Sequence, residues 1–387
     1  MKNIKIFDTT LRDGLQTPSI FISDNNWVKL ATLLDNLGVD IIEAGFPISS
    51  KKSLNNMKKI SKKIKRSTLC GLARHEFKDI EAVNEALKHA KKRRLHLFIP
   101  TSKIHLKYKL ECSYNDVKKN IVQKLKFANN FFSDIEWSSE DATRSDKRFL
   151  ADCLSLAIEN GAKTINIADT VGYIYPDNME DLINYLKSNV HNFNKVNFSV
   201  HCHNDLGMAT TNSLKAIENG ASQVECTLNG IGERAGNASL QEIVMNLKIR
   251  EKEFKKKTNI KFKNLYKTSV FLSKAIGVEI GKTDPIIGHN AFTHESGIHQ
   301  HGILKNKKTY EVITPELIGR KSGILTLGIN SGMHGLKYHL KKNKIKINNL
   351  SKFYTYFKKR AANLKIVDKF MLNKISNEYK NKINKIN

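Results

Sequence analysis

Short apolar runs alternate with longer segments of helical periodicity through about the first 250 residues of the chain. Eight of the runs have strand length and are rich in β-branched and aromatic residues; they span 4–10, 40–46, 67–73, 94–100, 133–139, 163–169, 196–203 and 222–228. Segments between them repeat apolar residues at helical spacing, at 25–38, 79–92, 116–130, 150–161, 179–189 and 209–220, and three of these end on glycine: Gly38, Gly161 and Gly220. This alternation predicts parallel βαβ units.

Eight such units within about 250 residues match a closed (β/α)₈ barrel better than an open doubly wound sheet, which usually has fewer strands. We therefore expect an α/β protein with a catalytic barrel over residues 1–255. Residues 256–387 are mostly helical in pattern and predict a smaller second region, packed on the barrel and ending in a mobile tail rich in Lys and Asn.

The chain is strongly basic, with a formal net charge of +28 and a pI near 9.7. Its lysines are scattered, often beside asparagine, which is typical of solvated faces. A basic RNA-binding protein is the non-enzymatic alternative, because lysine neutralises phosphate. No RNP-type, zinc-finger or helix-turn-helix motif accompanies the charge, so we expect no nucleic-acid partner.

The cysteines and the hydropathy indicate the cellular setting. Five cysteines, an odd number without CxxC spacing, argue against a disulfide framework or a structural zinc cluster and favour a reducing compartment. No stretch approaches the ~20 uninterrupted apolar residues of a membrane-spanning helix, and the N-terminus has no apolar signal segment. These features predict a soluble cytoplasmic protein without a membrane partner.

Polar side chains follow nearly every predicted strand at its carboxyl end, where barrels of this kind place their chemistry. A purely structural role would spread such residues over both rims of the barrel. The set comprises Asp13, Glu43, His96, Ser138, Glu140, Asn166, Thr170, His201, His203 and Asn237.

The segment HCHNDLG suggests a metal site at this rim. His201 and His203 share one face of their strand, because successive side chains alternate. Two hydrogen-bonded rim histidines remain the alternative until a carboxylate joins them. Barrel closure would bring Asp13 close, and Asn237 could add an amide oxygen. A mixed nitrogen and oxygen set suits Mn²⁺ or Mg²⁺, with Zn²⁺ possible.

The segment NGIGERAG has GxGxxxG spacing and follows the last strand of the array. A dinucleotide-binding loop would have GxGxxG spacing and would follow a first strand. We interpret these glycines as permitting a tight loop that places Asn237.

These motifs resemble those of a known enzyme family. FDTTLRDGLQ, IIEAGFP, EWSSEDATR, INIADTVGY, HCHNDLGMATTNSL and VECTLNGIGERAGNASL resemble the 2-isopropylmalate synthase family of metal-dependent barrel condensing enzymes. Homocitrate synthase, citramalate synthase and 3-hydroxy-3-methylglutaryl-CoA lyase are its relatives. HESGIHQHGILKNKKTYEVITPELIG extends the resemblance into the second region.

The resemblance implies an acyltransferase of leucine biosynthesis, which joins acetyl-CoA to 3-methyl-2-oxobutanoate and releases 2-isopropylmalate and CoA. It implies that Arg12 faces the developing oxyanion, and that Glu140, His299 and Tyr310 serve the deprotonation of acetyl-CoA. It further implies a homodimer. Asp13, His201, His203 and Asn237 would form the metal site, and His96, Ser138, Asn166 and Thr170 would surround the 2-oxo acid.

Glu136 bears on the choice of the 2-oxo acid. It shares the inward face of its strand with Ser138 and Glu140. A carboxylate there would repel the distal carboxylate of 2-oxoglutarate, so we expect an uncharged branched substrate. A homocitrate or citramalate synthase using another 2-oxo acid is the alternative.

Two further expectations concern the class of enzyme and its regulation. A metal-dependent hydrolase also uses an HxH pair, but on the first strand, where this chain has Arg12 and Asp13. Longer members of the family carry a leucine-binding regulatory domain after the second region. We expect this chain to lack that domain and to be insensitive to leucine.

Overall fold

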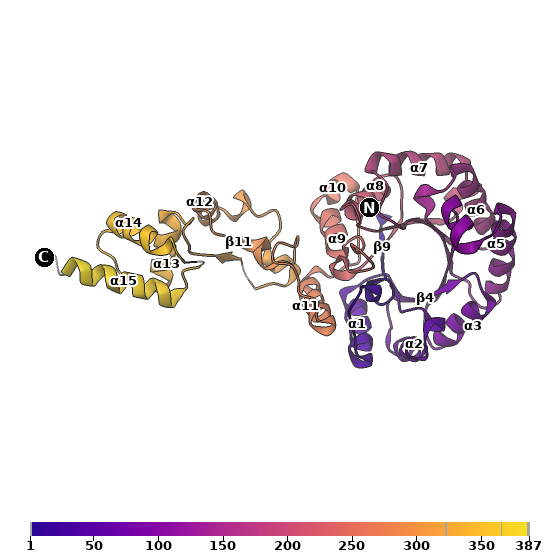
Figure 1. The fold of residues 1–387 in the computed structure, drawn as a ribbon, viewed down its shortest axis with the longest axis horizontal. Helices are drawn as coiled ribbons and strands as arrows, with labels where there is room; N and C mark the ends of the chain where they lie inside the picture. Colours follow the sequence, from indigo (N-terminus) through magenta and orange to yellow (C-terminus); the bar gives the residue numbers. More distant parts are fainter. Residues whose placement is uncertain (1, 322, 365, 385–387) are drawn as a thin grey trace. The chain divides into compact units, whose positions relative to one another are not determined.

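A computed structural model describes residues 2–321, 323–364 and 366–384 of the chain (Figure 1). The chain divides into two compact units, 1–280 and 281–387. The sequence pattern put the boundary at 255/256 instead. Residues 256–280 belong with the first unit because helix α11 (Leu265–Ile276) packs against α1, with Lys29 Nζ lying 4.9 Å from the ring centre of Phe271.

The first unit is a closed parallel barrel, which confirms the predicted fold class. Its strands follow one another around the ring in chain order, and the last pairs with the first in the register Ile6↔Val224. Figure 1 shows this ring of strands with helices outside it. The strands are β2 (Lys5–Asp8), β3 (Ile41–Glu43), β4 (Thr68–Arg74), β5 (Arg93–Pro100), β6 (Ile135–Glu140), β7 (Thr164–Asp169), β8 (Asn197–Cys202) and β9 (Gln223–Cys226).

A helix follows each barrel strand, and local capping sets the helix ends. Ser23 accepts a hydrogen bond from the Asn26 backbone at the start of α1, which stops at Gly38 in the left-handed region, φ 95°. Ser113 and Asp116 form a capping box before α5. The helices are α1 (Asp24–Leu37), α2 (Lys51–Lys63), α3 (Phe77–Ala86), α5 (Tyr114–Ala128), α6 (Lys147–Glu159), α7 (Pro176–Asn189), α8 (Ala209–Glu218) and α9 (Leu240–Ile249).

Smaller elements complete the first unit. After β5, the short helix α4 (Lys103–His105) continues into a π-helical turn, η3 (Leu106–Leu110). Such π turns often occur at functional sites. The first unit also contains several short 3-10 turns, α10 (Glu251–Phe254) and a two-stranded parallel ribbon of β1 (Lys2–Asn3) and β10 (Lys256–Lys257).

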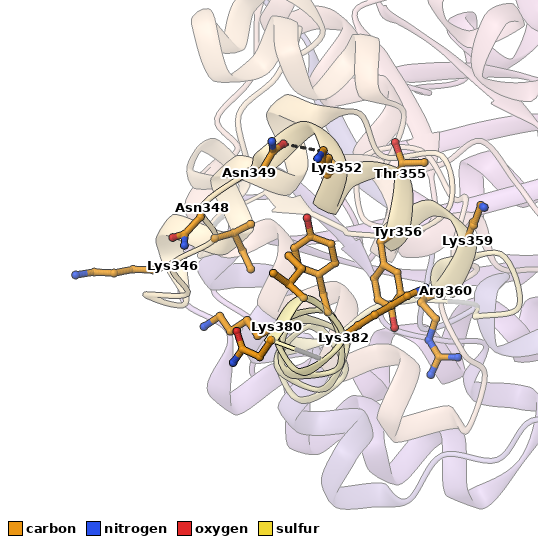
Figure 2. Close-up of a pocket in the computed structure, with 14 residues that line it drawn as sticks. Lys346, Asn348, Asn349, Lys352, Thr355, Tyr356, Lys359, Arg360, Lys380 and Lys382 are labelled. Carbon is orange, nitrogen blue, oxygen red and sulfur yellow. Dashed lines mark hydrogen bonds between the residues drawn. The ribbon is translucent and has the colours of Figure 1, made fainter. Parts of the chain in front are cut away.

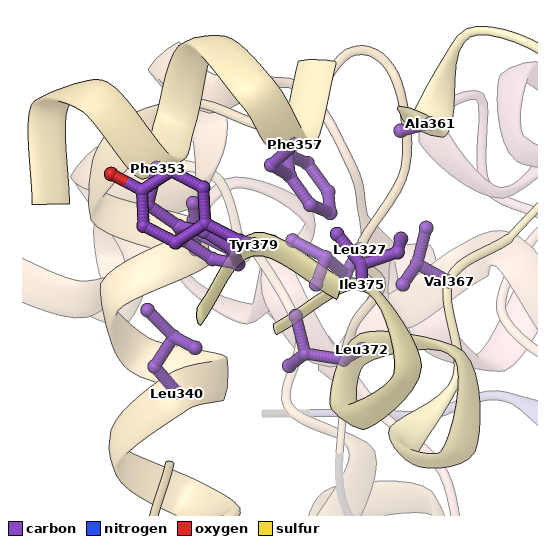
Figure 3. Close-up of a cluster of buried hydrophobic side chains, with 10 residues drawn as sticks. Leu327, Leu340, Phe353, Phe357, Ala361, Val367, Leu372, Ile375 and Tyr379 are labelled. Atoms are coloured by element: carbon purple, nitrogen blue, oxygen red, sulfur yellow. The ribbon is translucent and has the colours of Figure 1, made fainter. Parts of the chain in front are cut away.

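The second unit is mostly helical, as its sequence pattern predicts. It contains α12 (Gly297–Lys305), α13 (Met333–Lys342), α14 (Leu350–Ala361), α15 (Lys369–Asn384) and a parallel pair, β11 (Thr293–His294) with β12 (Ile324–Leu325). Figure 3 shows its core, in which Phe353 and Phe357 of α14 lie among aliphatic side chains such as Leu340 and Leu372.

The expectation of a mobile Lys/Asn-rich tail is wrong for residues 369–384, which form α15. Its buried residues Leu372, Ile375, Ser376 and Tyr379 recur at helical spacing and pack on the core of the second unit. Its lysines, Lys369, Lys374, Lys380 and Lys382, are exposed. Residues 385–387 lie outside the described part of the chain. Among the described residues, no helix combines the length and apolar character needed to cross a bilayer.

Candidate active site

A hollow of about 370 Å³ lies at the carboxyl ends of the barrel strands. Of the eleven barrel residues that the sequence predicts for the site, Glu43 and Asn237 do not line this hollow and the other nine do. The nine are Arg12, Asp13, His96, Ser138, Glu140, Asn166, Thr170, His201 and His203. Closure of the barrel therefore gathers side chains that are up to 191 positions apart, from Arg12 to His203, at one mouth.

Asp13, His201 and His203 form a possible metal site, since their ligand atoms all lie within 4.8 Å of one another. Asp13 Oδ2 is 3.4 Å from His201 Nε2 and 3.9 Å from His203 Nε2, and the two Nε2 atoms are 3.2 Å apart. All three residues are buried. The alternative of two histidines without a carboxylate is excluded, because Asp13 faces both rings.

Asn237 lies beside this cluster and pairs with His203 in an isolated antiparallel bridge. Its Nδ2 donates to Asp13 Oδ1 and to the Ile231 carbonyl, both at 3.1 Å. Its Oδ1 is buried and has no hydrogen-bond partner among the described residues. A buried carbonyl oxygen without a donor is costly, and a hard cation would satisfy it. The donor set of Asp13, His201, His203 and Asn237 therefore fits a divalent ion of intermediate hardness.

Glycines shape the loop that holds Asn237. A Cβ at Gly232 would collide with Asn237 Nδ2, and one at Gly236 would collide with the Gly230 carbonyl. Gly230 and Gly236 also have φ of 65° and 85°, in the left-handed region. The GxGxxxG spacing thus serves close backbone packing around Asn237.

Glu225 of β9 contacts the far side of the His201 ring, with Oε2 3.0 Å from Nδ1. Sequence reasoning missed this residue, although Gln223 and Glu225 alternate along QVECTL on the inward face of β9. A carboxylate on the second imidazole nitrogen fixes the tautomer and orients the ring, as in many metal sites.

The charges around the two histidines split their pKa values. Burial opposes protonation of His201, but Asp13 and Glu225 on either side outweigh it and raise its pKa to about 10. Burial, together with the positive charge of His201, lowers the pKa of His203 to about 4. Against its burial, Arg12 and His201 hold the pKa of Asp13 well below its usual range. At neutral pH these shifts favour a cationic His201 beside a neutral His203.

The Glu43 carboxylate contacts both Arg12 and His96. Arg12 donates from Nη1 to Asp13 Oδ2 at 2.7 Å and from Nε to Glu43 Oε2 at 2.6 Å. Glu43 Oε1 lies 2.7 Å from His96 Nδ1, and the other ring nitrogen lies 2.5 Å from Ser138 Oγ. Glu43 is fully buried and orients both side chains. Burial disfavours the charged form of His96, but Glu43 raises its pKa.

Two further residues extend this chain of contacts. Asn166 donates from Nδ2 to Ser138 Oγ at 2.8 Å, which leaves its buried Oδ1 without a partner at the hollow. Thr170 Oγ1 accepts a hydrogen bond from the Asp141 backbone at 2.9 Å. Thr170 therefore stabilises the loop after β6 while it lines the hollow.

Glu140 ends β6 at the edge of the hollow. Its Oε1 accepts from Lys109 Nζ at 2.6 Å and lies 3.6 Å from His105 Nε2, both from the segment after β5. Its Oε2 is buried and has no hydrogen-bond partner. Sequence reasoning missed Lys109, whose placement depends on the π-helical turn η3.

Arg234 links three motifs at the mouth. It donates to both carboxylate oxygens of Asp205, at 2.6 and 2.9 Å, and to the Thr170 carbonyl at 2.8 Å. Arg234 has φ 54°, in the left-handed region, which an arginine adopts only at a conformational cost. Sequence reasoning also missed this pair, which joins GERAGN to HNDLG.

The structure contradicts the substrate argument built on Glu136. This carboxylate accepts from Arg94 Nη1 at 2.7 Å and from Gln223 Nε2 at 2.8 Å, is fully buried, and does not line the hollow. Burial raises its pKa to about 7, against the opposing charge of Arg94. Its charge is therefore not presented to a substrate. The apolar part of the wall comes from Phe46, Leu72, Phe98 and Ala168.

His299 and Tyr310 lie in the second unit, where their rings stack with centroids 4.2 Å apart. His294 lies 6.4 Å from each ring, and its Nε2 is 3.7 Å from Glu311 Oε1. The two predicted residues thus lie together within their own unit. Their roles stay predictions.

The family model described as HMGL-like matches residues 3–272, and that described as Homocitrate synthase post-HMGL domain-like matches residues 286–365. The chain is 48% identical over 337 residues to a 2-isopropylmalate synthase of Halalkalibacterium halodurans, covering 87% of this chain and 65% of the relative. It is 48% identical over 339 residues to that of Pyrococcus furiosus, covering 88% and 68%. The chain thus spans about two thirds of the length of these relatives.

Solved structures of hydroxymethylglutaryl-CoA lyases share the fold. The Pseudomonas aeruginosa lyase superposes with a TM-score of 0.62 at 19% identity, over 75% of this chain and 96% of the lyase. The Brucella melitensis lyase gives 0.60 at 19% identity, over 71% and 99%. At such low identity, the likeness shows the barrel fold and no more.

Proposed function

This chain belongs to the HMGL-like family, and from that membership we propose that it catalyses the 2-isopropylmalate synthase reaction. The reaction joins the acetyl group of acetyl-CoA to 3-methyl-2-oxobutanoate and releases CoA. The observation that supports it most is the buried cluster of Asp13, His201 and His203, with the unsatisfied Oδ1 of Asn237 beside it. The relatives at 48% identity are named 2-isopropylmalate synthases, which supports the proposal.

The proposed cofactor is one divalent ion, Mn²⁺ or Mg²⁺, held by Asp13, His201, His203 and Asn237. A bound ion of this kind acts as a Lewis acid that makes a keto carbon electrophilic. Arg12 is held at this position by Glu43 and Asp13, and it donates to the oxygen that becomes negative during attack. His96, Ser138, Asn166 and Thr170 surround the 2-oxo acid.

The acetyl methyl group must lose a proton, which requires a base. Glu140 is the carboxylate of the barrel that we assign to this step, because its Oε2 is buried and unpartnered while Lys109 anchors Oε1. His299 and Tyr310 of the second unit are the residues we assign to the acetyl-CoA side of the reaction. We further propose a homodimer and, from the five free cysteines, a reducing cytoplasmic setting.

The wall of the hollow supports an uncharged branched substrate. Phe46, Leu72, Phe98 and Ala168 offer no partner for a distal carboxylate, and the cations Lys109 and Arg234 of the same wall are already paired with Glu140 and Asp205. An unpaired buried charge is costly. This favours 3-methyl-2-oxobutanoate over 2-oxoglutarate. Pyruvate differs from the branched acid by one or two methylene equivalents, a difference of ~1–3 kcal/mol in such pockets.

The test is release of CoA thiol from acetyl-CoA with a panel of 2-oxo acids, with and without Mn²⁺ after chelation. We expect metal-dependent release, fastest with 3-methyl-2-oxobutanoate. Faster release with pyruvate or 2-oxoglutarate would reassign the substrate and make the chain a citramalate or homocitrate synthase. Absence of metal-dependent release with every 2-oxo acid would contradict the synthase proposal.

A further inference from the structure

The second unit contains a larger hollow, of about 980 Å³, to which nothing above assigns a role. Small-molecule sites span ~300–1,000 Å³, so the volume suits a compact organic ligand. Loop 346–349, α14 and α15 enclose it, and Figure 2 shows its basic side chains around the edge. We call it the α14–α15 pocket. Six of its lining residues are basic: Lys346, Lys352, Lys359, Arg360, Lys380 and Lys382.

The charge of this pocket exceeds what the composition explains. Six of its fourteen lining residues are basic, against 65 of 387 in the whole chain, and none is acidic. In the described part of the chain, Arg360 forms an ion pair, at 2.7 Å with Glu378, while the five lysines form none with a carboxylate. Some lysines elsewhere are paired, as Lys215 is with Glu180 at 2.7 Å. Uncompensated like charges around one hollow attract anions.

The floor of the pocket is aromatic and aliphatic. Tyr356 and Tyr379 line it, with ring centroids 5.4 Å apart, beside Ile347 and Ile383. Tyr379 is 8% exposed, belongs to the core of the unit (Figure 3), and has a buried hydroxyl without a hydrogen-bond partner. Tyr356 is only half-buried, and Lys382 Nζ lies 6.0 Å from its ring centre. One aromatic side chain is therefore accessible within a ring of cations.

We propose that the α14–α15 pocket binds a nucleotide with two or more phosphate groups. The phosphates would neutralise the unpaired lysines, since charge-assisted hydrogen bonds to phosphate are strong. The flat base would pack on Tyr356 and the neighbouring isoleucines. An extended single strand of RNA stacks successive bases on several accessible rings. Here the second ring, Tyr379, is more than nine-tenths buried, so the pocket accommodates one base.

The test measures the fluorescence anisotropy of N-methylanthraniloyl-ADP during titration with the full chain. We expect saturable binding that ADP displaces and that adenosine does not. The Lys352→Gln/Lys380→Gln variant should bind at least tenfold more weakly. The matched Lys78→Gln/Lys126→Gln variant, which removes two exposed unpaired lysines from α3 and α5, should bind like the wild type. Circular dichroism melts check that each variant folds.

A second pair of variants tests the aromatic contact. Tyr356→Phe retains the ring and should bind the probe like the wild type, whereas Tyr356→Leu should bind several-fold more weakly. Equal loss in both lysine variants would show attraction to net charge alone and overturn the proposal. Binding left intact by Lys352→Gln/Lys380→Gln would locate the probe elsewhere and also overturn it. So would a ten-nucleotide single-stranded RNA that displaces the probe at lower concentration than ADP.

Discussion

Oε2 of Glu225 lies 3.0 Å from Nδ1 of His201, on the ring nitrogen that does not face Asp13. We therefore expect Glu225→Gln to weaken Mn²⁺ affinity by about 10- to 100-fold, the usual effect of losing such an outer partner. Isothermal titration of Mn²⁺ into the chelated protein measures this. The matched control is Glu136→Gln, which removes a buried barrel carboxylate paired with Arg94. Equal losses in both variants would contradict a positioning role for Glu225.

His203→Ala removes a predicted ligand outright. We expect Mn²⁺ affinity to fall by more than the ~100-fold limit for outer partners, and metal-dependent CoA release to fall with it. The control is His191→Ala. This histidine lies outside the proposed metal site: its side chain is 72% exposed, and its Nδ1 lies 3.3 Å from Glu159 Oε1. Mass spectrometry of bound metal together with the thiol assay reports both effects. Unchanged ion content in His203→Ala would disprove the metal site.

Gly232→Ala tests the loop that positions Asn237. The added Cβ would collide with Asn237 Nδ2, so the amide must move away from Asp13. We expect at least a tenfold loss of Mn²⁺ affinity, comparable to losing an outer partner. Gly277→Ala is the control: its Cβ meets nothing within 4 Å, and its left-handed φ of 73° costs about 1 kcal/mol of stability. Wild-type Mn²⁺ affinity in Gly232→Ala would argue against ligation by Asn237.

Leu72→Ala should change the preferred 2-oxo acid. Leu72 of β4 lines the apolar wall, so its truncation makes room for a longer side chain. We expect kcat/KM for 4-methyl-2-oxopentanoate to rise about tenfold relative to 3-methyl-2-oxobutanoate, the lower end of methylene discrimination. Leu69→Ala, in the same strand but outside the wall, should lower stability and leave this ratio unchanged. A constant ratio in Leu72→Ala would exclude the residue from specificity.

His75 should make stability depend on pH. It is buried between Trp137 Nε1, which donates to its Nε2 at 3.0 Å, and Asn120 Oδ1, 3.0 Å from its Nδ1. Burial lowers its pKa from 6.5 to about 4. The unfolded chain therefore binds this proton first as pH falls. The stability from His75 is complete above pH 6.5 and decreases as pH falls toward 4, with about 2 kcal/mol lost by pH 5.

Urea unfolding at pH 7 and pH 5 measures this effect. Between the two pH values, the wild type should lose about 2 kcal/mol more than His75→Gln, which retains polar atoms but does not titrate. The other ionisable groups contribute equally to both proteins. Parallel losses would show that His75 is not buried in its neutral form.

Most of the barrel could be predicted from sequence because its signals are local. Strand alternation placed His201 and His203 on one face, and each of the eight predicted strands overlaps an observed barrel strand. The residues that prediction missed, Glu225, Lys109 and Arg234, depend on contacts between distant segments. Lys109 reaches Glu140 only through a π-helical turn, and Arg234 meets Asp205 only because of a left-handed backbone.

The pattern of residues along the chain was enough to determine the alternating strands and helices, the rim that bears polar side chains and the family motifs. Each of these depends on spacing within one segment. Tertiary structure alone decided which polar side chains meet: Asn237 contacts Asp13 across 224 positions, and Arg94 pairs with Glu136 away from the site. It also decided that the lysine-rich end forms a packed helix. The physical reason is that a side chain's partners are set by barrel register and closure, which bring together residues with no local relation in sequence.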